Sequence, residues 1–167
     1  MKLAKVLIAF TAAVLLLGTG FLIFTVWSRH RSMEYQFQVE AVLNAASIAN
    51  QQDPQETDPE KSVIAEYDGK RTVVVPGNYR ALSSYLRKDA ASLLFFSMNR
   101  EKALKLTVCG EAVLTIAPQT DSGDVVLIEM TTLGQTFHMR ADGGNLWTNL
   151  LACSMKGTYH DENIPLE

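Results

Sequence analysis

The sequence predicts an α+β protein: an N-terminal transmembrane helix, which can continue into a juxtamembrane helix, precedes a small antiparallel-sheet domain with one or two packed helices. Three observations support this fold class. Residues 6–28 contain no charged side chain, residues 33–50 repeat apolar side chains at helical spacing, and from residue 62 onward apolar and polar residues alternate as in half-buried strands. The part of the chain after the apolar run is long enough for one domain with its own core.

Residues 6–28 form the predicted transmembrane helix. A helix of these 23 residues is roughly 34 Å long at 1.5 Å per residue, against a hydrocarbon core of about 30 Å. The run exceeds the apolar region of a cleaved signal peptide, and Trp27, Arg29 and Arg31 stand where a small-residue cleavage site is expected. Because an indole ring and arginines suit the membrane interface, an uncleaved anchor is favoured over a cleaved signal peptide and over a buried soluble helix.

The charges that flank the run predict its orientation. Lys2, Lys5 and the α-amino group precede it, whereas Arg29 and Arg31 follow it, so the positive-inside rule favours a cytoplasmic N-terminus by a single charge. The cytoplasmic tail, residues 1–5, is also short enough to stay behind while the rest is translocated. We therefore expect a single-pass protein of the plasma membrane with an extracytoplasmic C-terminal domain.

Residues 29–50 are predicted to form a juxtamembrane amphipathic helix. Since no proline or glycine separates it from the end of the apolar run, one helix can extend from about residue 5 to residue 50. Its apolar stripe must be covered, either by the core of the domain itself or by a partner. That partner would be another membrane or envelope protein or a second copy of the chain, in contact with Tyr35, Val39, Val42 and Ala46.

Residues 51–61 are predicted to be an acidic linker, because they contain two prolines, four acidic residues and no apolar side chain. The linker lacks the glycine and the oxygen spacing of a calcium-binding EF-hand loop. The α+β domain is expected to occupy residues 62–156, followed by a flexible tail at 157–167.

The strongest local signal in the domain is a hairpin. Asp68 and Gly69 separate two runs rich in β-branched residues and tolerate the positive φ of a two-residue turn. Asn78 follows a Pro-Gly pair and is expected to cap a short helix. The apolar segment 92–98 fits either an extension of that helix or a fully buried strand.

Four further alternating segments predict an antiparallel meander with one buried face. Its turns are expected at 109–110, 120–123 and 133–134, and a short amphipathic helix is expected at 145–156. The side chains predicted to point inward are Leu104, Leu106, Val108, Leu114, Ile116, Val126, Ile128, Met130, Phe137 and Met139.

Charge and cysteine content limit the function. Two of the 15 basic residues precede the apolar run and all 18 acidic residues follow it, so the rest of the chain has a formal charge of −5. A soluble part of this sign is not expected to bind nucleic acid through its phosphates. Cys109 and Cys153 are too far apart for a CxxC motif; outside the cytoplasm they can form one disulfide, or they pack as two buried thiols.

The sequence contains no catalytic, cofactor-binding or metal-binding motif, so we predict no enzyme activity, no cofactor and no metal. His138 and Arg140 lie on the outward face of one predicted strand, and Glu129 lies on the strand before it. If these strands form a hairpin, Glu129 stands beside His138 or Arg140 as a cross-strand pair that is structural rather than catalytic.

These features favour a membrane-anchored protein whose extracytoplasmic domain is a protein-interaction or assembly module. The lack of an Asn-x-Ser/Thr sequon and the small size fit a bacterial cell envelope. Two alternatives stay open: a membrane-tethered, sensor-like ligand-binding domain, which would need a deep apolar pocket, and a membrane-tethered hydrolase, which would need a cleft with histidine or carboxylates. Exposed Leu, Phe or Trp147 on a flat face would favour the interaction module.

Overall fold

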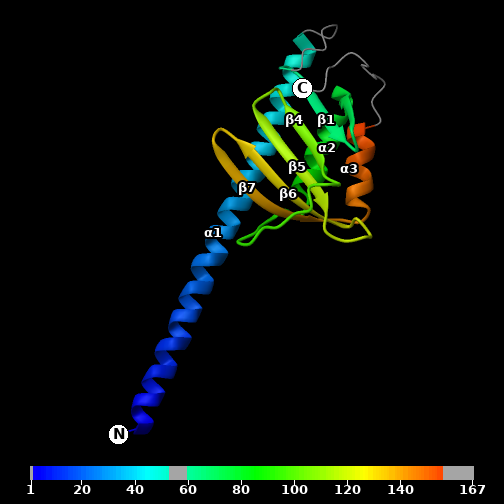
Figure 1. Ribbon diagram of the computed structural model, residues 1–167. Helices are drawn as coiled ribbons and strands as arrows, with labels where there is room; N and C mark the ends of the chain where they lie inside the picture. Colours follow the sequence, from blue (N-terminus) through cyan, green and yellow to red (C-terminus); the bar gives the residue numbers. More distant parts are fainter. Residues whose placement is uncertain (1, 53–59, 156–167) are drawn as a thin grey trace.

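The computed structural model describes residues 2–52 and 60–155, with side chains for residues 10–50 and 60–155. One helix, α1 (Lys2–Gln52), forms the whole N-terminal part of the chain. Its N-terminal half stands away from the rest of the molecule, and its C-terminal half lies against a β-sheet domain (Figure 1). The predicted α+β fold class and the predicted continuous helix are both confirmed.

The domain is built on one antiparallel sheet of seven strands, in the order β2-β1-β4-β5-β6-β7-β3. Strands β4 to β7 form the predicted meander, the β1–β2 hairpin adds to the β4 edge, and β3 pairs with β7 at the other edge. The strand bounds are β1 Val63–Tyr67, β2 Lys70–Val73, β3 Ala91–Ser92, β4 Leu104–Val108, β5 Ala112–Pro118, β6 Val125–Thr132 and β7 Gln135–Asp142.

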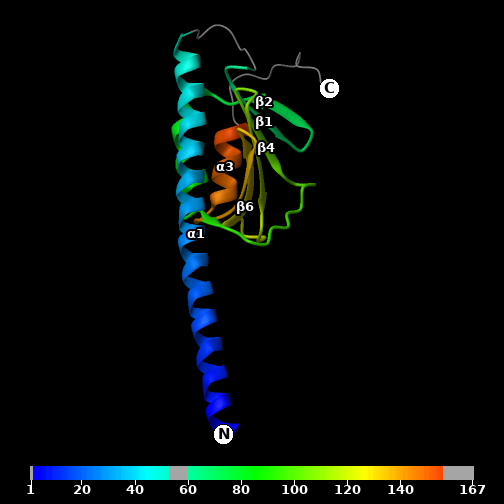
Figure 2. The same ribbon diagram turned by 90° about the vertical axis from the view of Figure 1, so that its left-hand side faces the viewer.

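Two short helices accompany α1 on one face of the sheet. A 3-10 turn, η1 (Pro76–Asn78), leads into α2 (Tyr79–Arg87), and α3 (Leu146–Met155) follows β7. Helix α2 contacts both α1 and α3, and α3 also contacts β1, β2 and β6. Within the described residues the opposite face of the sheet, here called the outer face, carries no helix (Figure 2).

The hydrophobic core lies between the sheet and the three helices. Leu106, Leu114, Met130 and Phe137 lie in one row across β4 to β7, because each is paired with the next in the strand register. All ten side chains that the alternation predicted to point inward are buried. The meander was predictable because a strand buried on one face must repeat its apolar residues with a period of two.

The C-terminal half of α1 belongs to this core, which corrects the proposal of a partner-facing stripe. Tyr35, Val39 and Ala46 have no exposed surface, and Val42 packs against the same cluster. The Tyr35 hydroxyl donates a hydrogen bond to the Leu86 carbonyl on α2 at 3.0 Å. The stripe is therefore covered by the domain itself, and the core begins within α1 rather than at residue 62.

The N-terminal half of α1 is apolar on every side and is exposed from Phe10 to Trp27. Two of its threonines are satisfied within the helix: the Thr19 hydroxyl donates to the Leu15 and Leu16 carbonyls, and the Thr25 hydroxyl donates to the Leu22 carbonyl. This half is long and apolar enough to span a membrane.

Three local predictions concern the turn at 68–69, the cap at Asn78 and the segment 92–98. The hairpin turn is confirmed, since Asp68 and Gly69 have φ values of 51° and 71° as a type I′ turn requires. Asn78 does not cap α2 with its side chain; its amide instead donates to the Cys153 carbonyl at 2.9 Å. The segment 92–98 is neither a helix extension nor a buried strand, because only Ser92 pairs in a strand and the chain then continues without regular structure to β4.

Two expectations fall wholly or partly outside the described residues. The predicted tail at 157–167 lies beyond residue 155, and most of the acidic linker lies between residues 52 and 60.

Candidate functional site

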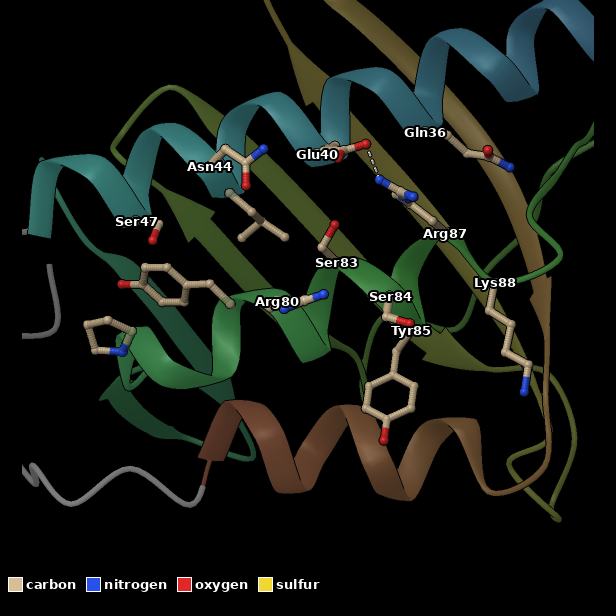
Figure 3. A pocket seen from close by; sticks show the side chains of 13 residues that line it. Gln36, Glu40, Asn44, Ser47, Arg80, Ser83, Ser84, Tyr85, Arg87 and Lys88 are labelled. Atoms are coloured by element: carbon tan, nitrogen blue, oxygen red, sulfur yellow. Dashed lines mark hydrogen bonds and ion pairs between the residues drawn. The ribbon is translucent and has the colours of Figure 1, made fainter. Parts of the chain in front are cut away.

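A polar groove of about 910 Å³ lies between α1 and α2 and is here called the α1–α2 groove (Figure 3). Its walls follow from helical spacing, because polar residues recur every three or four positions on the facing sides of both helices. Helix α1 contributes Gln36, Glu40, Asn44 and Ser47, and α2 with the residue after it contributes Arg80, Ser83, Ser84, Arg87 and Lys88. Leu43 and Tyr79, both buried, also line the groove.

The groove is positively charged, because three basic side chains, Arg80, Arg87 and Lys88, line it with a single carboxylate, Glu40. Glu40 and Arg87 form an ion pair across it, as the dashed line in Figure 3 shows. Arg80 and Lys88 form no ion pair with any residue that the structure describes, and the Arg87 Nε–H has no hydrogen-bond partner there. Such a surface suits a polar, negatively charged segment rather than an apolar ligand.

The outer face of the sheet carries a second cluster, made of Phe96, Arg100, Glu129 and His138. Glu129 and His138 are direct cross-strand neighbours on β6 and β7, with 3.4 Å between Glu129 Oε2 and His138 Nε2. Arg100 Nη2 donates to both Glu129 carboxylate oxygens, at 2.7 and 3.0 Å. The Phe96 ring stacks on the His138 ring with centroids 4.3 Å apart.

This cluster holds the connection between β3 and β4 against the sheet, because Phe96 and Arg100 both belong to that connection. The predicted cross-strand pair of Glu129 and His138 is confirmed. Arg140 does not join them, since its guanidinium pairs with Asp142 on its own strand at 3.2 Å. The contacts of Glu129 and His138 are thus structural ones.

Both cysteines are free thiols in the structure. Cys109 and Cys153 are each half-buried and pack against the core. Of the two expected arrangements, the structure therefore has two packed thiols and not a Cys109–Cys153 disulfide. Burial raises the pKa of each thiol, and Glu111 adds to the effect at Cys109, so both stay protonated at neutral pH.

Among the residues whose side chains are described, no three potential ligands of the types His, Cys, Asp and Glu come together as a metal site. An interaction surface would require an exposed Trp147, but its ring packs edge-on against Tyr67, with ring centroids 5.7 Å apart. Large exposed apolar side chains outside α1 are found instead at Leu94, Phe95 and Leu133.

The sequence did not reveal the α1–α2 groove, since the groove depends on how α2 docks on α1. The four-residue repeat of Gln36, Glu40 and Asn44 marked one polar helix face, but such faces are usually only solvated. The exposure of Leu94 and Phe95 was missed because an apolar run normally indicates burial.

Fold and surface define an α+β domain carried on one long N-terminal helix that is apolar enough to cross a membrane. No family model matches the chain, and no curated protein and no solved structure is similar enough to count as a match.

Proposed function

We propose that this chain is a single-pass membrane protein whose α+β domain acts as an assembly module that binds another protein of a bacterial cell envelope. The continuity of α1 carries this proposal: one helix passes from an exposed, wholly apolar half into the core of the domain. Such a join fixes the height and tilt of the domain over a bilayer, which a flexible linker would leave free. A fixed placement is useful to a subunit that positions a partner.

The apolar half of α1 has the properties of a membrane span. The hydroxyls of Thr19 and Thr25 bond to carbonyls of the same helix, so they need no water in the hydrocarbon core. Trp27 stacks on Phe24 with centroids 6.1 Å apart, at the end where an aromatic belt is expected. The flanking charges favour residues 1–5 in the cytoplasm and the domain outside the plasma membrane.

The α1–α2 groove is the proposed partner site, and an acidic extended segment of another envelope protein is the proposed occupant. Arg80 and Lys88 supply the positive charge, and the open polar walls can accept main-chain and side-chain hydrogen bonds. The groove is polar rather than deep and apolar, which supports an interaction module over a sensor-like ligand-binding domain.

Crosslinking in native membranes tests this site. Benzoylphenylalanine at Asn44, which is exposed and lines the groove, should give a specific adduct with a partner. The same probe at the exposed Thr131, on the outer face, is the matched control and should not give that adduct.

Charge reversal then tests the chemistry. Arg80→Glu with Lys88→Glu should abolish the Asn44 adduct, whereas Lys70→Glu with Lys102→Glu makes the same change of charge elsewhere and should leave it intact. Equal loss in both double variants, with unchanged thermal unfolding, would show that the groove is not the site.

Orientation has a separate test. A cysteine at the exposed Lys102, with Cys109 and Cys153 replaced by serine, should react with an impermeant maleimide in intact cells. Labelling only after lysis would place the domain in the cytoplasm and contradict this part of the proposal.

A further inference from the structure

The connection between β3 and β4 exposes apolar side chains without a cover in the described part of the chain. Phe95 is 91% exposed and Leu94 is 59% exposed, in the sequence Leu93-Leu94-Phe95-Phe96. Exposing two adjacent large apolar side chains to water is unfavourable, so they are expected to meet an apolar phase or a partner.

These side chains are not exposed because their segment is loose. On one side, the Leu93 N–H donates to the His138 carbonyl at 2.9 Å, which extends the pairing of β3 with β7. On the other side, Phe96 stacks on His138 and Arg100 pairs with Glu129. The backbone is therefore fixed before and after Leu94 and Phe95, and the two side chains project from a held position.

The connection begins beside the part of α1 that directly follows its apolar half. The Ser92 N–H donates to the Ser32 hydroxyl of α1 at 3.1 Å. Figures 1 and 2 show the connection, in green between β3 and β4, along the margin of the domain that is nearest the N-terminal half of α1. In both views this margin of the domain lies closer to the apolar half of the helix than the β6–β7 turn does.

The distances fit a contact with the bilayer that α1 is proposed to cross. Ser32 lies four residues beyond Ser28, about 6 Å along a helix axis, which is comparable to the thickness of one headgroup layer. An extended chain advances about 3.3 Å per residue, so Leu94 and Phe95 can return across that layer from Ser92. Arg29, exposed on the neighbouring turn of α1, is placed to meet lipid phosphates.

We propose that Leu94 and Phe95 insert into the boundary between headgroups and acyl chains, as a second membrane contact that orients the domain on its anchor. This proposal rests on the proposed membrane anchoring by α1. A lipid surface is the occupant favoured over a protein because the connection that carries the pair lies along the margin of the domain nearest the end of the proposed span (Figures 1 and 2). Helix and loop together would prevent the domain from tilting away from the bilayer.

Lipid photocrosslinking of the full-length chain tests the insertion. The chain is reconstituted at low density in vesicles of phosphatidylcholine and phosphatidylglycerol. Each variant carries benzoylphenylalanine at one position, and adducts are identified by their mass in mass spectrometry. Position 95 carries Phe in the native chain and is exposed, so this probe is tolerated there. Leu22 in the apolar half of α1 is the positive control, and Leu133, 79% exposed in the β6–β7 turn, is the matched exposed control.

We expect phospholipid adducts at positions 95 and 22 in comparable yield, several-fold above the yield at position 133. Adducts at position 22 with none at position 95 would overturn the insertion and leave the anchor in place. An adduct between two copies of the chain at position 95 would also overturn it, because a second copy would then cover the pair. No lipid adduct at position 22 would overturn the anchor and the insertion together.

Discussion

The two halves of α1 share one backbone but differ in composition and in surroundings, since residues 6–28 are uncharged and residues 29–50 carry charged and amide side chains. From Phe10 to Trp27 the apolar side chains point in every direction and all are exposed. From Arg31 onward one stripe, at Tyr35, Val39, Leu43 and Ala46, is buried against the sheet and α2, whereas Met33, Phe37 and Ile48 on the other side stay exposed. A helix segment that is uncharged and exposed on every side is thus suited to lipid, whereas a segment with charged side chains and one buried apolar stripe belongs to the core.

The boundary between the halves is marked by Arg31. Its guanidinium donates to the Thr136 carbonyl at 2.8 Å, lies 4.4 Å from the centre of the Phe137 ring and pairs with Glu34 at 3.2 Å. The sequence suggested a headgroup contact for this arginine, but its partners belong to the domain. The domain is thus bonded to α1 only three residues after Ser28.

The largest effect should follow a charge placed in the stripe. Val39→Asp puts a carboxylate at a position with no exposed surface and should lower the free energy of unfolding by about 4 kcal/mol or more, enough to unfold the domain. Ala45→Asp, on the exposed side of the same helix segment, should change it by less than about 0.5 kcal/mol. Chemical unfolding of the full-length chain in detergent measures both; similar values for the two variants would show that the stripe is not core.

A break between the halves should separate their roles. His30→Pro removes one main-chain hydrogen bond of α1 and clashes with the preceding turn, at a cost of about 3 kcal/mol to the helix. We expect the domain to stay folded while the lipid adduct at position 95 falls, because the height of the domain is no longer fixed. His30→Ala is the control and should retain both properties. Unfolding of the domain by the proline alone would mean that its stability depends on the apolar half.

A subtler change inside the stripe tests its polar contact. Tyr35→Phe removes the hydrogen bond to the Leu86 carbonyl and should cost about 1 kcal/mol, measured by urea unfolding at neutral pH. An unchanged midpoint would show that this bond contributes nothing net.

The same tyrosine predicts a pH dependence. Burial raises the pKa of Tyr35 above its usual value of 10.0, so the folded state keeps the phenol proton while the unfolded chain releases it. The contribution of Tyr35 to stability is therefore complete below pH 10 and is lost as the pH rises above it. Tyr35→Phe should show a smaller loss of stability than the native chain between neutral and alkaline pH.

The smallest effect is expected on the outer face. Glu129→Gln weakens the partly exposed pair with Arg100 and should lower stability by less than about 1 kcal/mol. Because that pair holds the β3–β4 connection, amide hydrogen exchange should increase in residues 93–103 and not in β5. Asp142→Asn weakens the exposed pair with Arg140 instead and should leave exchange in that connection unchanged.

The sequence predicted what short-range periodicity determines. Alternation placed the inward residues of β4 to β7, Asp68 and Gly69 placed a turn, and the uncharged run placed the apolar half of α1. It did not decide what covers Val39, because a helical stripe looks the same whether it meets its own sheet or another chain.

Long-range packing decided the rest. Residues 92–98 were expected to extend a helix or to form a buried strand, since sequence patterns do not show that Phe96 and Arg100 hold the β3–β4 connection against the sheet and leave Phe95 outside. The charge of the α1–α2 groove likewise results from two helices that are distant in sequence and meet only in the fold.

An accessibility scan along α1 tests the central claim most directly. Single spin labels from Phe10 to Asn50, in the full-length chain in bilayers, report collisions with oxygen and with a water-soluble nickel complex. We expect oxygen access and little nickel access at every position from 10 to 26, and then a helical repeat in which positions 35, 39, 43 and 46 are shielded from both. A helical repeat of nickel access in the first segment would contradict a membrane span that continues directly into the core of the domain.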